Sequence, residues 1–386
     1  MLERTELVAV AKRMLAHYEN GTTDQTDDIA TVLVASYADP ARWQDEIDLI
    51  FKRVPLGLTL SCELREAGAY KALDALGVPV LVVRGADGVA RSFLNVCRHR
   101  GAAIVDPGCG AARRFACPYH AWTYDQAGRL VGVYGEETFG SVDRDSHGLA
   151  PLPTAERGGF VFTVLTPDAP MDIDAWLGDY AEELDKLDLA TWHVFSRREL
   201  VGANWKVCYD GYLEGYHFAS LHRNTIFKQT MSNLMATDAF GPHQRIVFAR
   251  HSLPELRELP EDEWVPTDHI GPVYTIFPHV SIAGCWGEQA MVSQLFPGPT
   301  ADRSRTVQTI ITRHPIESDE AREKAETYTN FLYDVVRDED YKTGLDIQKG
   351  LTSGANTHFT FGRNELTLQR FHGWVDRLLA GSGTDT

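Results

Sequence analysis

The stretch Asn95–Asp125, "NVCRHRGAAIVDPGCGAARRFACPYHAWTYD", brings two thiols and two imidazoles together in two short arms. The first arm is Cys97-x-His99, and after seventeen further residues the second arm is Cys117-x2-His120. Such a set can hold zinc tetrahedrally, or a [2Fe-2S] cluster with both thiolates on one iron and both imidazoles on the other. A zinc finger pairs Cys with Cys and His with His, whereas each arm here is mixed. The mixed arms therefore favour a cluster held between two loops, each of which gives one ligand to each iron.

The residues around the two arms predict a small antiparallel β-domain over residues 51–165. Short runs rich in Val, Phe and Leu, separated by Gly, Pro and Asp, are typical of short strands joined by turns. These runs are "VPVLVVRG", "RSFLNVC" and "GFVFTVL". Gly101, Gly108 and Gly110 permit tight turns in the arms, and Pro118 stiffens the second one. We expect Cys109, which lies between the arms, to be a small buried filler.

Residues 166–386 predict a larger α+β domain. Four runs indicate strands of a mixed sheet, namely "RIVFARHSL", "VYTIFPHVSIAG", "AMVSQLFPG" and "RTVQTIITRHP". The long charged run over residues 319–351 predicts helix. Residues 1–50 predict a helical segment that packs on this larger domain, because apolar residues recur there at helical spacing: Leu7, Val10, Ala11, Met14 and Leu15.

A second pattern lies in "NWKVCYDGYLEGYHFASLHRNT" (Asn204–Thr225), which contains His217-x4-His222 beside carboxylates. Two histidines and one carboxylate can bind Fe(II) on one face and leave the other positions open for O2 and substrate. Residues five apart on an ideal helix point roughly 140° apart. The two rings can therefore converge on one metal only if the helix contains a π-bulge or one histidine lies beyond the helix end.

Composition limits the class of protein. The chain has 386 residues, enough for two domains, and a formal net charge of −17, which argues against nucleic acid or anionic membrane as a partner. No apolar stretch reaches 18 residues, and the apolar run near the N-terminus is too short for a signal peptide. The 6 cysteines are too scattered for a disulfide framework. We therefore expect a cytoplasmic protein without a membrane span.

The two arms resemble the cluster-binding loops of Rieske non-heme iron oxygenases, the catalytic (alpha) subunits of ring-hydroxylating and demethylating systems. The matching text is "CRHRG" and "CPYHAWTYDQAGRL". The resemblance implies a Rieske [2Fe-2S] cluster bound by Cys97, His99, Cys117 and His120. One departure is Ala121, where the family usually has Gly. We expect this alanine to be tolerated.

The segment Asn204–Thr225 resembles the second motif of the same family, and "RDEDYKTGLDIQKGL" resembles a third. The resemblance implies a helix-grip-like catalytic domain that binds mononuclear Fe(II) through His217, His222 and Asp340. It gives Glu214 another role, in which its carboxylate joins the iron site of one subunit to a cluster histidine of the neighbouring subunit. A rival hypothesis makes Glu214 the third iron ligand in place of Asp340.

The family resemblance implies a terminal oxygenase. Such an enzyme uses O2 and electrons relayed from NAD(P)H through a separate reductase or ferredoxin. It would hydroxylate, cis-dihydroxylate or demethylate a small, aromatic substrate, as a homo-oligomer built on rings of three, with or without a beta subunit. Two alternatives stay open: a Rieske electron-transfer protein without oxygenase chemistry, and a quaternary-ammonium demethylase of the same family.

The expected substrate pocket is apolar and aromatic, and such walls can also form a cage for a quaternary ammonium group. Its predicted wall consists of Tyr212, Phe218, Ile226, Phe227, Leu234, Met235, Ile276, Phe277, Ile282, Trp286 and Phe296. Asp210 is either a support of the junction between subunits or a surface acid.

Overall fold

The computed structural model describes residues 3–381, which divide into two compact units. Within the described residues, unit 1 comprises residues 3–50, Leu177–Leu187 and residues 192–381, and unit 2 comprises Phe51–Trp176 and Asp188–Thr191. No helix in the described part of the chain is long and apolar enough to cross a membrane.

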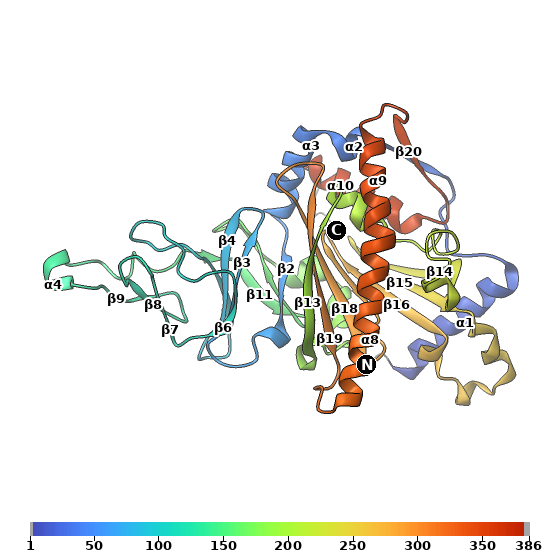
Figure 1. Cartoon of the computed structure of the whole chain (residues 1–386), viewed down its shortest axis with the longest axis horizontal. Helices are drawn as coiled ribbons and strands as arrows, with labels where there is room; N and C mark the ends of the chain where they lie inside the picture. Colours follow the sequence, from blue (N-terminus) through green and yellow to red (C-terminus); the bar gives the residue numbers. More distant parts are fainter. Residues whose placement is uncertain (1–2, 382–386) are drawn as a thin grey trace. The chain divides into compact units, whose positions relative to one another are not determined.

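Unit 2 is built from short strands that pair antiparallel in three small sheets within the described residues (Figure 1). The strand orders are β10-β5-β4-β3-β6, β11-β12-β2 and β7-β8-β9. The strands are β2 (Leu56–Leu60), β3 (Ala69–Ala75), β4 (Val78–Arg84), β5 (Ala90–Leu94), β6 (Gly108–Ala111), β7 (Arg114–Ala116), β8 (Thr123–Asp125), β9 (Leu130–Gly132), β10 (Pro151–Leu152), β11 (Thr154–Arg157) and β12 (Phe160–Thr163). The small antiparallel β-domain expected around the two arms is therefore confirmed.

The core of unit 2 lies directly beneath the two arms. Phe93, Phe115 and Tyr124 are buried there in one apolar cluster, and the side chains of Cys97 and Cys117 belong to the same cluster. Burying aromatic side chains of this size contributes a large share of the stability of a small domain. The sulfur atoms are thus held by the packing that folds the domain.

Unit 1 is built on a seven-stranded sheet with the order β13-β19-β18-β17-β16-β15-β14. Its strands are β13 (His193–Gly202), β14 (Thr230–Phe240), β15 (His243–Arg250), β16 (Ile270–Ile276), β17 (Val280–Ala283), β18 (Gln289–Pro297) and β19 (Ser304–Thr312). Every pairing is antiparallel, so the expectation of a mixed sheet was wrong. From β14 to β19 each strand pairs with the next one along the chain, and the crossover helices that parallel pairs need are missing from the described connections.

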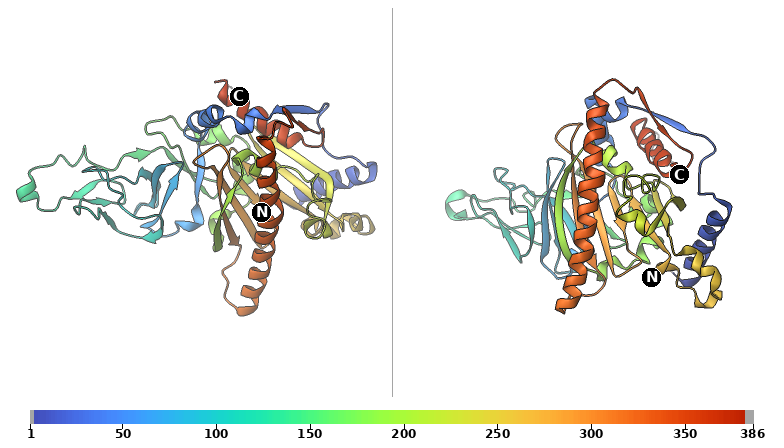
Figure 2. Two further views of the ribbon diagram at one scale, coloured as in Figure 1. Left: turned by 45° about the horizontal axis from the view of Figure 1, so that its top comes forward. Right: turned by 45° about the vertical axis from the view of Figure 1, so that its right-hand side comes forward.

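The predicted long helical run is confirmed and forms one continuous rod (Figure 1), which Figure 2 shows from two further sides. It consists of α8 (Asp319–Val335), η8 (Val336–Tyr341) and α9 (Lys342–Leu351), of which η8 is a π-helical turn. The rod is anchored on strand β19: Tyr333 donates a hydrogen bond of 3.2 Å to the carbonyl of Gln308, and Tyr341 donates one of 2.5 Å to Thr306.

The N-terminal helix α1 (Arg4–Asn20) packs on the sheet as expected. Its buried face contains Ala11, Met14 and Leu15, which pack against Leu234 of β14 and Val247 of β15. The remaining elements of unit 1 are β1 (Ala30–Leu33), α2 (Ala35–Ala38), α3 (Pro40–Asp45), η1 (Glu46–Phe51), α6 (Tyr180–Asp185), α7 (Trp205–Asp210), η4 (Ile226–Lys228), η5 (Leu253–Glu258), η6 (Glu261–Glu263), η7 (Pro266–Asp268), β20 (His358–Phe361) and α10 (Leu366–Leu379).

A fully buried ion pair ties the N-terminal segment to helix α7. The ammonium group of Lys206 contacts both carboxylate oxygens of Glu46, and Trp205 donates its indole N–H to the same carboxylate over 2.7 Å. Burial lowers the pKa of Lys206, and the charge of Glu46 opposes this shift. Because two charges are costly to bury unless they stay paired, this contact holds the first turn of α7 against the N-terminal segment.

Replacing Lys206 with Met should lower the free energy of unfolding by about 3–5 kcal/mol, because the carboxylate of Glu46 would remain buried without a cation. Urea unfolding followed by tryptophan fluorescence measures the loss. Lys12→Met is the matched control, since Lys12 pairs with Glu261 in solvent and exposed pairs contribute about 0–1 kcal/mol. Equal losses in the two variants would contradict the anchoring role.

Candidate metal centres

The two arms of unit 2 are closed by the same pair of backbone hydrogen bonds. In the first arm the N–H of Cys97 donates to the carbonyl of Ala102 over 2.8 Å, and the N–H of Gly101 donates to the carbonyl of Cys97 over 2.9 Å. The second arm repeats this pattern. The N–H of Cys117 donates to the residue five positions later, and the residue four positions later donates back to Cys117, over 2.8 and 2.9 Å. Each arm is therefore a tight loop that begins at its cysteine.

The repeated loop shows why glycine suits the position after the second histidine. Gly101 and Ala121 occupy the same position in their loops, and both have left-handed backbones, with φ of 77° and 56°. A side chain in this conformation costs roughly 1–2 kcal/mol, a cost that glycine avoids. Ala121 is therefore tolerated at a cost in local stability.

The donor atoms of the two arms fit a two-iron cluster. The thiols of Cys97 and Cys117 are buried, and the Nδ1 atoms of His99 and His120 are buried without a hydrogen-bond partner in the described part of the chain. A buried polar atom without a partner is costly, which is the state expected of a metal ligand considered without its metal.

A single zinc ion suits these four residues less well. Among residues 3–381, the group of His, Cys, Asp and Glu side chains whose donor atoms come within 4.8 Å of one another is the set His217, His222 and Asp340. Cys97, His99, Cys117 and His120 do not form such a single-ion group. Together with the mixed arms, each with one thiol and one imidazole, this supports the cluster interpretation over a single zinc ion.

Aromatic side chains surround the candidate cluster ligands. The ring of His99 stacks on Trp122 with 5.0 Å between centroids and 9° between planes. The hydroxyl of Tyr124 accepts the N–H of Arg98 over 3.0 Å and lies 3.4 Å from the sulfur of Cys97. Burial raises the pKa of Tyr124 well above its ordinary value, so the hydroxyl keeps its proton. A hydroxyl donor beside a ligand sulfur is one of the contacts that set a cluster's reduction potential.

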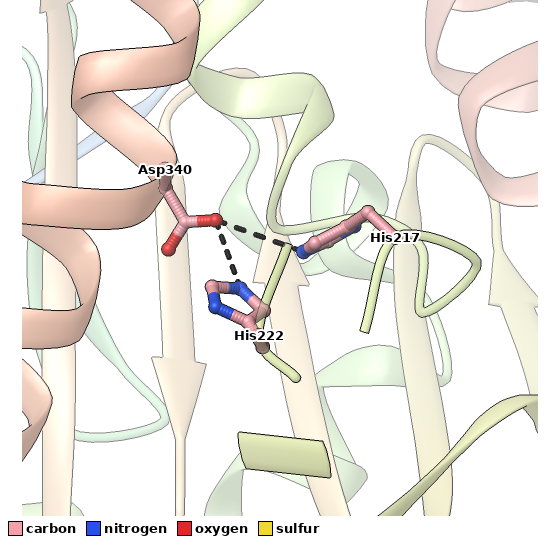
Figure 3. A group of neighbouring side chains, drawn as sticks. All are labelled: His217, His222 and Asp340. Atoms are coloured by element: carbon pink, nitrogen blue, oxygen red, sulfur yellow. Dashed lines mark ion pairs between the residues drawn. The ribbon is translucent and has the colours of Figure 1, made fainter. Parts of the chain in front are cut away.

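The second centre lies in unit 1, where the structure brings together the two histidines and Asp340 (Figure 3). Oδ1 of Asp340 lies 3.0 Å from Nε2 of His222 and 3.6 Å from Nε2 of His217. Two imidazole nitrogens and one carboxylate oxygen on one side of a common point make the donor set of a non-heme Fe(II) site. The geometry favours Asp340 over Glu214 as the third donor, because Glu214 contacts the opposite nitrogen of His217.

Each imidazole of this centre is held by a carboxylate at its Nδ1 atom. Glu214 accepts from Nδ1 of His217, and Oε2 of Glu339 lies 2.5 Å from Nδ1 of His222. A proton on Nδ1 leaves the lone pair of Nε2 free to bind a metal, and Nε2 is the atom that each ring directs toward Asp340. Thr225 donates to the same oxygen of Glu339 over 2.7 Å.

The charges around His222 attract a cation. Burial disfavours the charged form of His222, but the hydrogen bonds and charges of Asp340 and Glu339 outweigh burial and raise its pKa. A site whose carboxylates stabilise positive charge at a buried ring is suited to a divalent metal.

The chain brings the histidines together by leaving the helix. His217 and His222 both lie in the turns that follow helix α7, so they meet the expected condition of lying beyond a helix end. Asp340 lies in the π-helical turn η8 instead. The π-bulge considered for the histidine spacing thus occurs at the carboxylate, and π turns of this kind are common at functional sites.

Two cavities meet at this centre, and Glu214, His217 and Asp340 line both. The first cavity, of about 360 Å³, has a polar side formed by Tyr37, Asp210 and Glu365 among others. The second, of about 270 Å³, includes His222 and has mainly apolar walls. These walls come from Tyr212, Phe218, Ile226, Phe248, Val273, Met291, Leu332, Val335 and Val336.

Part of this second wall was predicted from the sequence. Tyr212, Phe218 and Ile226 line the cavity as expected, whereas Leu234 and Trp286 pack with helix α1 instead. The last turn of α8 contributes residues that were missed. Their position just before Asp340 in the sequence was an available signal.

Asp210 lies in a network within the chain, where it accepts hydrogen bonds of 2.7 Å from Tyr37 and 2.9 Å from His372.

The expectation that Cys109 is a buried filler was wrong, because its side chain is exposed on strand β6. All four residues of that strand are exposed, so a small side chain there packs into no core.

Replacing Ala121 with Gly should raise the free energy of unfolding of unit 2 by up to about 1 kcal/mol. Glycine adopts the left-handed conformation without strain, and this gain exceeds the cost of the greater conformational freedom of glycine in the unfolded chain. Denaturation followed by loss of the cluster's visible absorption measures the change. Ala116, exposed in strand β7, provides the control. Ala116→Gly should destabilise by about 0.5–1 kcal/mol, and a loss of the same size in Ala121→Gly would contradict the strain.

Two parts of the chain match known protein families. Residues 173–381 match the family "Ring hydroxylating alpha subunit (catalytic domain)", and residues 56–142 match the "Rieske [2Fe-2S] domain". The solved structure of the quaternary ammonium Rieske monooxygenase CntA with L-carnitine superposes with a TM-score of 0.77 at 22% identity, covering 91% of this chain and 96% of that one. This likeness confirms the expected fold.

Two relatives are similar in sequence. The glycine betaine monooxygenase oxygenase subunit of Chromohalobacter salexigens is 34% identical over 187 residues, which are 48% of this chain and 42% of the relative. The chlorobenzene dioxygenase subunit alpha of Cupriavidus sp. (strain PS12) is 34% identical over 187 residues, 46% of this chain and 41% of the relative. The matches thus span less than half the length of either relative.

The matched domains imply a Rieske [2Fe-2S] cluster and a mononuclear iron, and the two groups of donor atoms described above suit them. The chain belongs to the family of ring-hydroxylating oxygenase alpha subunits, in which a Rieske domain precedes the catalytic domain.

Proposed function

We propose that the chain is the terminal oxygenase of a multicomponent Rieske system. The observation that carries this proposal is the set His217, His222 and Asp340 beside an apolar cavity. An electron-transfer protein needs the cluster domain alone and has no use for a second metal centre that opens onto a cavity. The alternative of a pure electron carrier is therefore disfavoured.

We assign Cys97, His99, Cys117 and His120 to the cluster, and His217, His222 and Asp340 to the mononuclear iron. When bound, the two centres supply O2 activation with electrons delivered one at a time. The overall change is R–H + O2 + 2 e⁻ + 2 H⁺ → R–OH + H2O, in which a C–H bond becomes C–OH and the second oxygen atom leaves as water.

The residues of the chain prepare this reaction. Glu214 and Glu339 hold the protons on the Nδ1 atoms and keep both Nε2 lone pairs directed at one point. The apolar wall of the second cavity keeps water from the reacting carbon and holds the substrate beside the two rings.

The electron path is part of the proposal. Glu214 lines both cavities and holds His217, which suits a carboxylate that connects the iron site to the cluster of a neighbouring subunit. A ring of three subunits would provide that neighbour, and a reductase or ferredoxin charged by NAD(P)H in the cytoplasm would supply the cluster.

For the substrate we favour a small quaternary ammonium compound. The first cited relative acts on glycine betaine, and the faces of Tyr212, Phe218 and Phe248 in the cavity wall can contact a methylated ammonium group. Hydroxylation of a methyl group on the quaternary nitrogen produces an N-hydroxymethyl ammonium, whose C–N bond then breaks to release the tertiary amine, formaldehyde and a proton. An aromatic substrate is the second candidate, favoured by the same wall and by the likeness to a chlorobenzene dioxygenase.

The experiment combines metal analysis with turnover of glycine betaine under 18O2, using a surrogate reductase. The wild type should contain about three iron atoms and about two sulfides per chain. Asp340→Ala should lose about one iron atom and all turnover while keeping the cluster spectrum, because a site with two ligands holds Fe(II) poorly.

Glu214→Gln is the matched variant. It should keep its iron and a reducible cluster but deliver electrons to the iron site far more slowly, which single-turnover oxidation of the reduced cluster measures. Iron lost from Glu214→Gln and kept in Asp340→Ala would reverse the two assignments. A colourless protein with stoichiometric zinc would end the proposal.

The pair Glu339 and Asp338 gives a second test. Glu339→Gln should weaken Fe(II) binding about 10–100-fold, because an amide holds the proton of His222 less firmly than a carboxylate does. Asp338→Asn should leave Fe(II) binding unchanged, since that exposed carboxylate pairs with Arg337. Titration of the cluster-loaded protein with Fe(II) measures both, and equal effects would show that Glu339 acts through charge alone.

A further inference from the structure

The second cavity, which includes His222 and has mainly apolar walls, is also lined by one arginine. Apart from the metal-centre residues His217, His222, Asp340 and Glu214, its described lining is apolar or uncharged with one exception, Arg250. This arginine is the last residue of strand β15. A cationic group in an otherwise apolar wall calls for an explanation, because such walls usually contain few polar groups, placed where they fix the orientation of a ligand.

Contacts along the wall link the metal centre to Arg250. The ring of Phe218 lies 5.0 Å from that of His217 and 5.2 Å from that of Phe248, centroid to centroid. Phe248 and Arg250 both line the cavity and are two residues apart on one strand, so they share a face about 7 Å apart. The wall thus runs from the histidines past two phenylalanines to the arginine.

The guanidinium of Arg250 is available to a ligand. Its one hydrogen bond with a described residue is a long one of 3.4 Å to the carbonyl of Asp268, and it forms no ion pair with the residues that the structure describes. Arg245, five residues earlier on the same strand, is instead fully engaged, with Glu183 at 2.5 Å and Asp238 at 2.9 Å. The fold therefore neutralises one arginine of this strand and leaves the other exposed beside the cavity.

We infer that Arg250 is the subsite for an anionic group, a carboxylate, carried by the substrate at the end away from the reacting carbon. This inference rests on the proposed oxygenase function and names the chemistry of its substrate. A guanidinium binds a carboxylate through two parallel hydrogen bonds, which fix orientation as well as position. With the carboxylate at Arg250, the rest of the molecule lies along Phe248 and Phe218, and its far end reaches the two histidines.

This arrangement selects among substrates by charge. A neutral molecule of the same shape can fill the apolar wall but leaves the arginine without its partner. A carboxylate on a quaternary ammonium compound and one on an aromatic ring would use the same subsite, so the two substrate classes differ only in what contacts the phenylalanines.

The test compares acids with their neutral amides. The probes are γ-butyrobetaine with its carboxamide, and 4-methylbenzoate with 4-methylbenzamide. Equilibrium dissociation constants are measured by calorimetry on the protein loaded with cluster and iron, and KM and kcat are measured for any probe that is turned over. The proteins are the wild type, Arg250→Gln, Arg250→Lys and Arg322→Gln, the last being a control in the exposed face of α8.

The wild type should bind at least one acid about tenfold or more tightly than its amide, and Arg250→Gln should abolish this preference by weakening the acid alone. Arg250→Lys should retain part of the preference for the acid over its amide, and Arg322→Gln should retain all of this preference. For a probe that is turned over, the change should appear in KM far more than in kcat. Whichever acid shows the preference identifies the substrate class.

Equal binding of acid and amide by the wild type would overturn the inference, as would an equal loss of both in Arg250→Gln. Oxygenation of the amides would in that case leave the proposed function standing. Conversely, a preference for the acid that depends on Arg250, without oxygenation of any probe, would keep the anion subsite and count against the proposed oxygenase chemistry for these substrates.

Discussion

The arrangement of the catalytic unit depends on a pair of hydrogen bonds between carboxylates and imidazoles. Glu214 and Glu339 fix the rings of His217 and His222 by their Nδ1 atoms, so that both Nε2 atoms face Asp340. An imidazole without such a partner can exchange its tautomer and rotate, and the lone pair would then point at the site for part of the time only. The turns after α7 and the π turn in the long helical rod both serve to place these carboxylates.

The two metal centres are built in different ways, and this decides how much of each the sequence could predict. The arms of unit 2 are local: all four donors lie within 24 consecutive positions, from Cys97 to His120, and each loop closes on itself by backbone hydrogen bonds. The spacing of Cys and His was therefore enough to favour a cluster over zinc. The left-handed conformation of Ala121 depends on the same local geometry, but only the backbone dihedral angles of the structure reveal it.

The centre in unit 1 is assembled from distant segments. His217 and Asp340 are more than a hundred positions apart, so no spacing relates them, and the choice of Asp340 depended on a resemblance in the segment around it. Glu339 was missed because adjacent helical residues point in different directions, and only the rod's packing shows which one reaches His222. Only part of the cavity wall was predicted. The alternation of residues along a strand shows that the strand has two faces, but it does not show which face lines the metal centre. The antiparallel sheet likewise depended on pairings that the strand runs do not specify.

The π turn between α8 and α9 limits how the length of this chain can change. A π turn amounts to one extra residue in an α-helix, and each residue of an α-helix advances the direction of the side chain by about 100°. The helical segments before and after η8 are therefore out of phase by one residue. The segment before η8 provides Tyr333 as an anchor on the sheet. Deleting a single residue from η8 would restore a regular helix with both ends still able to pack. The deletion would move Asp340 relative to His217 and His222, so the length of this helix is tied to the position of the proposed iron ligand as well as to the core.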